Sequence, residues 1–278
     1  MVIIMALLSA LTYGSADFFG GMAARNTPAP SVVLWSQGFG LLVALAAAPL
    51  TGAASVSVQD LLWGMAAGIA GASGVGILYR GLAIGLASVV SPTAAVTGAA
   101  LPVLFAVIAG ERPELTTWAG IALALTAILL LSSAGGDRDS SVFKSLRYGV
   151  LAGCGFGGFF ILIARTGSGS GMWPLVAART VTIPLFLFVS LFRKNTLRPQ
   201  KGNLVFVFLA GTLDMGANVF YLLAARTGYM MIAVVLTALY PAATVLLQKS
   251  VRGEKLTAHR IVGLILAVAG AALIGTGG

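Results

Sequence analysis

Ten long apolar runs, separated by short polar breaks, fill almost the whole of this chain of 278 residues. The runs cover residues 2–24, 30–50, 60–82, 87–109, 115–135, 145–165, 173–192, 203–225, 229–249 and 258–276. A helix that crosses a bilayer needs about 20 mostly apolar residues, so each run is long enough to span. Only 9% of the residues are charged, against about a quarter in a soluble domain. The sequence therefore predicts an all-α integral membrane protein with ten transmembrane helices.

The net charge of +9 comes from basic residues in the connections between the runs. The connections between runs one and two, three and four, five and six, seven and eight, and nine and ten hold 13 of the 17 basic residues, whereas the other connections hold three. Cytoplasmic loops carry an excess of Lys and Arg, so this bias puts the basic connections in the cytoplasm and both termini outside. We expect a multi-pass protein of the cell inner (plasma) membrane, in contact with the lipid bilayer and not with nucleic acid.

The single cysteine and the single histidine exclude several kinds of site. Cys154 lies inside an apolar run, and His259 follows the ninth run and begins the tenth. One residue of each kind cannot build a disulfide framework, a zinc cluster or a Ser–His–Asp triad without further partners. The sequence therefore predicts neither a cofactor nor a bound metal.

The second half of the chain repeats the first. Under a shift of 143 residues, Gly110-Glu111 matches Gly253-Glu254, and each pair ends an apolar run and precedes a basic residue. This predicts two five-helix repeats, at residues 1–136 and 143–278, that form one membrane domain. Because five is odd, the second repeat must insert upside down relative to the first. Inverted repeats around a site at the bilayer midplane are typical of transporters.

Short motifs in the fourth and ninth runs indicate a family. The fourth run and its exit contain GLASVVSP at 85–92, LP at 101–102 and GER at 110–112; the ninth contains AVVLTALYP at 233–241 and GEK at 253–255. With ten runs in two halves, the chain resembles the EamA-type family of the drug/metabolite transporter superfamily. The resemblance implies a carrier of small metabolites, frequently an exporter of amino acids or related compounds, with a central cavity lined by both halves. It also implies cytoplasmic termini, opposite to the charge count.

Two positions depart from the family pattern. Asp17 stands where many members carry tryptophan or small polar residues, and Gly98 stands in the first half where the second half has Pro241. Proline removes a hydrogen-bond donor from a helix, so kinks are expected at the prolines inside the runs. These are Pro92, Pro102, Pro184 and Pro241.

Ionisable residues inside the membrane are the first candidates for a binding site, because they are costly there unless they have a role. Asp17 lies beyond the middle of the first run, with Tyr13 one turn earlier on the same face. It could bind a substrate ammonium group or carry a proton, or it could pair with Arg80 or Arg179. In the eighth run Asp214, Asn218 and Tyr221 form one polar stripe, which we interpret as cavity lining; polar contacts between helices are the alternative.

Further candidates for substrate binding follow from polarity and aromaticity. Arg80, beside Tyr79 near the end of the third run, could clamp a carboxylate or extend to the membrane surface. Thr93, Thr97 and Tyr240 give the fourth and ninth runs a polar face. Phe156 and Phe160 in the sixth run could form an aromatic wall or could pack in the ordinary way.

Together these features predict a transmembrane carrier, most simply an exporter, that works by alternating access around a central cavity and is not an enzyme. Its partners would be a small-molecule substrate, the bilayer and, if transport is coupled, protons; it would act as a monomer or a homodimer. Two alternatives come from other classes: an intramembrane enzyme that modifies lipids or isoprenoids, and a passive channel. The sequence offers no paired acidic motif for the first, and an internal repeat favours a carrier over the second.

Overall fold

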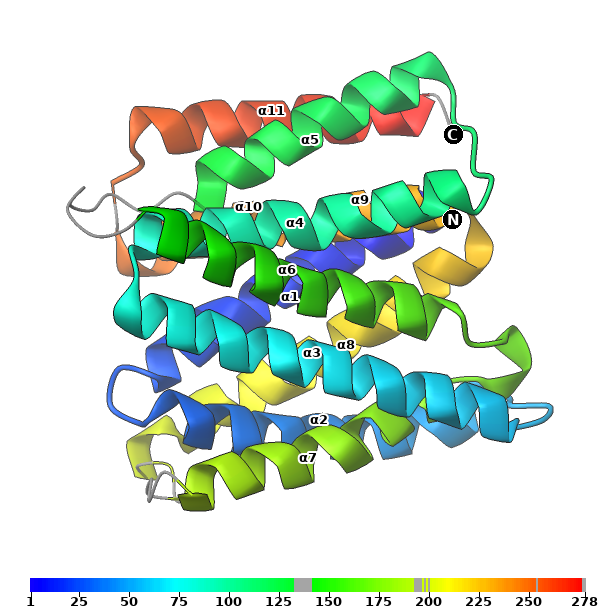
Figure 1. Ribbon diagram of the computed structural model, residues 1–278, viewed down its shortest axis with the longest axis vertical. Helices are drawn as coiled ribbons and strands as arrows, with labels where there is room; N and C mark the ends of the chain where they lie inside the picture. The colour runs from blue at the N-terminus through cyan, green and yellow to red at the C-terminus, as the bar shows by residue number, and fades with distance from the viewer. Residues whose placement is uncertain (133–141, 193–196, 198, 200, 254, 277–278) are drawn as a thin grey trace.

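The computed structural model describes residues 1–132, 142–192, 197, 199, 201–253 and 255–276, and in this part of the chain helices joined by short connections are the regular secondary structure (Figure 1). The α-helices are α1 Val2–Ala23, α2 Ala29–Leu50, α3 Val58–Ile84, α4 Ala87–Ile108, α5 Leu115–Ser132, α6 Val142–Ala164, α7 Trp173–Phe192, α8 Leu204–Thr227, α9 Met230–Thr237, α10 Tyr240–Arg252 and α11 Ala258–Thr276. Two short 3₁₀ turns, η1 at Ser168–Ser170 and η2 at Lys201–Asn203, precede α7 and α8.

The ten predicted spans are present in this fold. Ten segments are long and apolar enough to cross a membrane, and α9 and α10 together make up the ninth of them, Met230–Arg252. The predicted boundary between the two halves, at residues 136–143, falls largely on the segment 133–141, which lies outside the described residues.

The ninth span, in which a kink was expected at Pro241, goes further than a kink and breaks into two helices between Thr237 and Tyr240. Pro241 has no N–H to donate to the carbonyl of Thr237, and its ring crowds that carbonyl, so the helical ladder cannot pass this point. A tight turn replaces it, with the N–H of Leu239 donating to Leu236 (3.2 Å) and that of Ala242 to Leu239 (2.9 Å). The helices α4 and α7 continue through their prolines.

The packing pattern shows that the two halves are inverted copies. The pair α1–α8 has its counterpart in α6–α3, the pair α2–α8 in α7–α3, and α5 packs against its own counterpart α11. In Figure 1 both termini lie on one side of the molecule, together with the connections α2–α3, α4–α5, α6–α7 and α8–α9. We call this the terminal side. The opposite side, with the connections that hold most basic residues, is called the basic side.

The repeat extends to single hydrogen bonds. At the start of α3, Asp60 accepts a hydrogen bond from the hydroxyl of Ser170 at 2.5 Å. Asn203 lies 143 positions after Asp60, and Thr27 lies 143 positions before Ser170. These two equivalent residues are also bonded, because the amide of Asn203 donates to the hydroxyl of Thr27 at 3.0 Å. Each contact ties a connection of one half to the start of a helix in the other, so the halves are joined by equivalent contacts on both sides of the membrane.

Glycines on α6 bring it into close contact with α4. A Cβ atom at Gly149 would lie 2.6 Å from the Cβ of Thr93, and one at Gly153 would lie 2.5 Å from that of Thr97. Such separations are too short for real side chains, so only glycine allows this approach, as is usual where helices cross closely in membranes. The same device joins α1 to α10, where a Cβ at Gly14 would lie 2.5 Å from the carbonyl oxygen of Tyr240.

Candidate functional site

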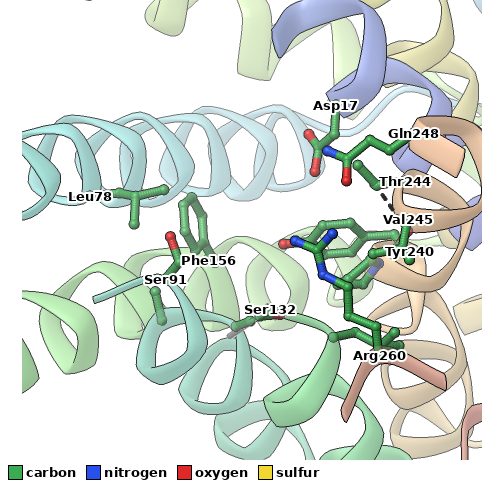
Figure 2. Close-up of a pocket in the computed structure, with 14 residues that line it drawn as sticks. Asp17, Leu78, Ser91, Ser132, Phe156, Tyr240, Thr244, Val245, Gln248 and Arg260 are labelled. Atoms are coloured by element: carbon green, nitrogen blue, oxygen red, sulfur yellow. Dashed lines mark hydrogen bonds between the residues drawn. The ribbon is translucent and has the colours of Figure 1, made fainter. Parts of the chain in front are cut away.

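A cavity of about 350 Å³ lies between the two halves, and it is not enclosed on every side (Figure 2). Four helices of the first half (α1, α3, α4 and α5) and three of the second (α6, α10 and α11) contribute to its wall. The lining residues are Asp17, Leu78, Ser91, Ala94, Ala95, Leu131, Ser132, Phe156, Tyr240, Pro241, Thr244, Val245, Gln248 and Arg260. Its size is in the range of small-molecule binding pockets.

The cavity belongs to the basic side of the molecule. Asp17 lies in the last two turns of α1, and Arg260 lies in the first turn of α11; both of these helix ends border basic connections. The other lining residues on α3, α4 and α5 likewise lie near their basic-side ends.

Two opposite charges face the cavity. Asp17 is exposed and Arg260 is partly exposed, and among the described residues neither side chain has a hydrogen bond or an ion pair with another. In the view of Figure 2, Gln248, Tyr240 and Thr244 surround these two charged groups, whereas Leu78 and Phe156 lie farther along the cavity. A carboxylate and a guanidinium without protein partners can each bind a group of opposite charge on a ligand.

An aromatic cluster lies next to the cavity toward the middle of the molecule. The ring centroid of Tyr13 lies 6.2 Å from that of Tyr240 and 6.4 Å from that of Phe160. The ring centroids of Phe160 and Tyr221 are 4.5 Å apart. The hydroxyl of the fully buried Tyr221 donates to the carbonyl of Phe160 at 3.0 Å. Four predicted site residues therefore contact one another here, and of these Tyr240 also lines the cavity.

The second intramembrane carboxylate has a different environment. Asp214 on α8 forms an ion pair with Arg179 on α7, with 2.5 Å between Oδ2 and the guanidinium nitrogen. Arg179 also donates to the side-chain oxygen of Gln37 on α2, and Asn218 donates to the backbone carbonyl of Asp214 at 2.7 Å. The stripe predicted on α8 is thus bonded to neighbouring helices and to itself, outside the wall of this cavity. Asp17 has neither of the two basic partners considered for it.

The remaining predicted residues lie elsewhere on α3 and α4. Arg80 is exposed, and its Nε donates to the hydroxyl of Tyr148 at 3.4 Å; Tyr79 is half-buried. Thr93 and Thr97 pack against the glycines of α6. Of the twelve predicted site residues, three line the cavity: Asp17, Phe156 and Tyr240.

Several lining residues escaped prediction from the sequence. Arg260 begins the last apolar run, where a basic residue is normally expected to anchor a helix at the membrane surface. Gln248 was a usable signal, since it is an uncharged polar residue at the end of an apolar run. Thr244, Ser91 and Ser132 carry small hydroxyls that are common in apolar helices and reveal little on their own.

The terminal side of the molecule is closed at the position equivalent to the cavity. Every residue from 231 to 237 in α9 is at most 1% exposed. The carboxylate of Glu111, in the α4–α5 connection of the first half, accepts hydrogen bonds from the N–H groups of Met230 (2.8 Å) and Met231 (3.1 Å) at the start of α9. These contacts join the two halves on this side. The equivalent glutamate, Glu254, lies outside the described residues.

Ten apolar spans in two inverted halves around a polar cavity define the architecture of a membrane transporter. A family model, the EamA-like transporter family, matches the chain twice, at residues 1–133 and 144–276. The chain belongs to this family, as its motifs predicted.

Comparisons with single proteins add support for the fold. Among solved structures 24 chains match. One of them, described only as the crystal structure of a protein, has a TM-score of 0.79 and 16% sequence identity, over 98% of this chain and 95% of that one. None of the curated proteins matches the sequence.

Proposed function

We propose that this protein is a carrier for small metabolites that bear both an amino and an acidic group, such as amino acids or related compounds. The observation that carries the proposal is the pair Asp17 and Arg260, which face one cavity between the two halves without partners among the described side chains. Asp17 would bind the ammonium group. Arg260 would bind the carboxylate, for which its planar guanidinium offers two parallel donors.

The rest of the cavity would select the body of the substrate. Phe156 and Tyr240 provide aromatic surface, and Gln248, Thr244 and Ser91 provide donors and acceptors for polar groups. A volume of about 350 Å³ suits a molecule of amino-acid size rather than a lipid. Since all of these residues belong to one chain, a monomer is sufficient to bind substrate, and a homodimer would contain two such sites.

We further propose that transport occurs by alternating access. The cavity lies toward the basic side, and α9 closes the terminal side at the equivalent place. Because the halves, here taken as residues 1–136 and 143–278, are inverted copies, exchanging their conformations would close the first side and open the second. The substrate would then be released across the membrane without a continuous pore.

The bias of basic residues toward one side of the molecule supports a location in the inner membrane and a direction of transport. Placing the basic connections in the cytoplasm, as the bias favours, lets the cavity load from the cytoplasm and makes the protein an exporter of the inner membrane. A proton bound at Asp17 is the simplest coupling ion, because this carboxylate has no basic partner among the described residues.

Binding by the purified protein tests the substrate class directly. The probes are an amino acid, its decarboxylated amine and its deaminated acid, measured by thermal shift on the wild-type protein, Asp17→Asn, Arg260→Gln and the control Ser73→Ala, an exposed serine of α3 outside the cavity wall. We expect the amino acid to bind most tightly, Asp17→Asn to weaken the amine and the amino acid, and Arg260→Gln to weaken the acid and the amino acid. Equal binding of the three probes to all four proteins would contradict the proposal.

Transport in proteoliposomes separates a carrier from the two rival classes. A carrier gives saturable uptake and exchanges labelled for unlabelled substrate, whereas a channel gives ion currents. An enzyme would convert the probe into a product, which mass spectrometry of the recovered substrate would reveal. Conversion of the substrate, or currents without saturation, would contradict the assignment as a carrier.

A further inference from the structure

The first three turns of α6 carry a second groove, and none of the residues that line it lines the central cavity. It has a volume of about 260 Å³ and is lined by Phe143, Lys144, Arg147, Tyr148 and Leu151. We call it the α6 groove. Since α6 begins at Val142, directly after the connection α5–α6, the groove lies at the basic-side end of a transmembrane helix.

The helix that carries the groove is held firmly in place. On its inner face, the hydroxyl of the buried Ser145 accepts a hydrogen bond from the N–H of Leu86 at 2.9 Å. Gly149 packs against Thr93 so closely that no side chain would fit. The residues on the outer face therefore keep a fixed spacing, and a ligand would meet a preformed surface.

Positive charge surrounds the groove. Lys144 and Arg147 are exposed on its wall. Arg80, at the end of α3, reaches the rim, since its Nε donates to the hydroxyl of Tyr148 at 3.4 Å. Two guanidinium groups and one ammonium group at a single rim are complementary to a phosphate group.

Apolar side chains continue from this basic rim along α6. Phe143 is 80% exposed, Val150 44% and Leu146 42%. In a helix that spans a membrane, such side chains face the acyl chains of lipids, and aromatic and basic residues collect at the level of the headgroups. A ligand that matches the whole surface must carry an anionic head and an apolar tail.

We propose that the α6 groove is a binding site for one anionic phospholipid of the leaflet on the basic side. The phosphate lies among Arg147, Lys144 and Arg80, the hydroxyl of Tyr148 contacts the polar part of the headgroup, and the acyl chains lie along Val150 and Leu151. A soluble phosphate would use the charges but leave the apolar surface without a role. Because Arg80 belongs to α3 and the lining residues belong to α6, the bound lipid contacts the basic-side ends of both helices.

Native mass spectrometry of the full-length protein in detergent tests the site. The probes are phosphatidylglycerol, phosphatidylcholine with the same acyl chains, and glycerol phosphate, which has the anionic head without the chains. The variants are Arg147→Gln, Lys144→Gln with Arg147→Gln, and the control Lys249→Gln, an exposed lysine at the basic-side end of α10.

We expect phosphatidylglycerol to bind the wild-type protein more tightly than phosphatidylcholine. Each charge removed from the groove should weaken binding about five-fold, the size expected for one basic residue near an anionic lipid surface. Lys249→Gln should bind like the wild type. Three results would overturn the proposal: unchanged lipid binding by the double variant, an equal loss in the Lys249→Gln control, or equally tight binding of glycerol phosphate. Unfolding temperatures without lipid show whether each variant is folded.

Discussion

Two carboxylates lie inside the membrane, and their surroundings differ. Asp214 is bound to Arg179 at 2.5 Å, with side-chain exposures of 33% and 8%. Asp17 is exposed at the cavity wall, with no basic partner among the described residues. A charge that already has a partner serves the fold, whereas a charge without one is available to a ligand or a proton. The sequence indicated both residues as candidates, and their partners now distinguish them.

Replacing Asp17 should remove binding and leave the fold intact. In Asp17→Asn we expect the affinity for an amino-acid substrate to fall about ten- to a hundred-fold, since a hydrogen bond to a charged group is worth roughly 1.5–3 kcal/mol. The unfolding temperature without substrate should stay near that of the wild type. Substrate titration by thermal shift measures both quantities. Wild-type affinity in this variant would exclude Asp17 from the site.

Replacing Asp214 should have the opposite effect. Asp214→Asn leaves the buried guanidinium of Arg179 without its counter-ion, which costs about 3–5 kcal/mol for a fully buried pair. We expect the lower end of this range, because Asp214 is 33% exposed. Adding Arg179→Gln should restore part of the stability. Chemical unfolding of the two single variants and the double variant gives the coupling energy between Asp214 and Arg179. Strictly additive losses of unfolding free energy would show that this ion pair does not stabilise the fold.

The type of residue at each position predicted only part of the cavity lining. Asp17, Phe156 and Tyr240 stood out by charge or aromaticity and do line the cavity. Arg260 did not, because a basic residue at the start of a span is the normal pattern at a membrane surface. Thr93 and Thr97 follow the pattern of a polar face, but the glycines of α6 draw α4 so close that these side chains pack against that helix.

At the level of helices, the broken ninth span is the main departure from the expected pattern. Pro241 separates α9, which is buried at the terminal side, from α10, which lines the cavity toward the basic side. One span thus contributes to both the closed and the accessible part of the molecule. The sequence predicted a kink at each of four prolines. At Pro241 the helix breaks completely, whereas α4 and α7 remain single helices through theirs, and the sequence did not distinguish these two outcomes.

The contact between Glu111 and α9 should help to hold the terminal side closed. Its two hydrogen bonds cap the start of α9, and losing such a cap costs about 1 kcal/mol. In Glu111→Ala we therefore expect the terminal side to open about five times more often. The matched control is Glu114→Ala, a glutamate of the same connection whose side chain is exposed.

The readout for Glu111→Ala is the rate at which a thiol reagent modifies Val234→Cys, a position that is fully buried on α9, in a Cys154→Ser background. The rate should rise about five-fold in Glu111→Ala and stay unchanged in Glu114→Ala. An unchanged rate in both variants would show that the closed side does not depend on this cap.

The whole molecule follows from features that are spread along the entire sequence. The ten apolar runs predicted the number of spans, and the shift of 143 residues predicted a repeat, which the family match at residues 1–133 and 144–276 bears out. The inversion of the second copy is seen in the helix packing. The conformation could not be predicted in the same way. An inverted repeat makes two states, related by a pseudo-two-fold axis in the membrane plane, equally plausible from the sequence.

The orientation in the membrane is a further prediction at this scale. Because 13 basic residues of the sequence lie in or next to connections of the basic side and three in or next to those of the terminal side, we expect the basic side in the cytoplasm. A reporter that is active only outside the cytoplasm should work when fused to residue 278, and a fluorescent protein that folds only in the cytoplasm should stay dark. The reverse result would agree with the orientation that the family resemblance implies, and the proposed direction of loading would be wrong.

Alternating access between equivalent positions is the central claim, and one measurement tests it most directly. Ser91 lines the cavity on α4, and Val234, 143 residues later, is fully buried on α9. Single cysteines at these two positions, without Cys154, are labelled with a thiol reagent in membranes, with and without substrate. We predict that Ser91→Cys reacts readily while Val234→Cys is protected, and that any condition that exposes one protects the other. Simultaneous labelling of both positions, or changes in the same direction, would contradict it.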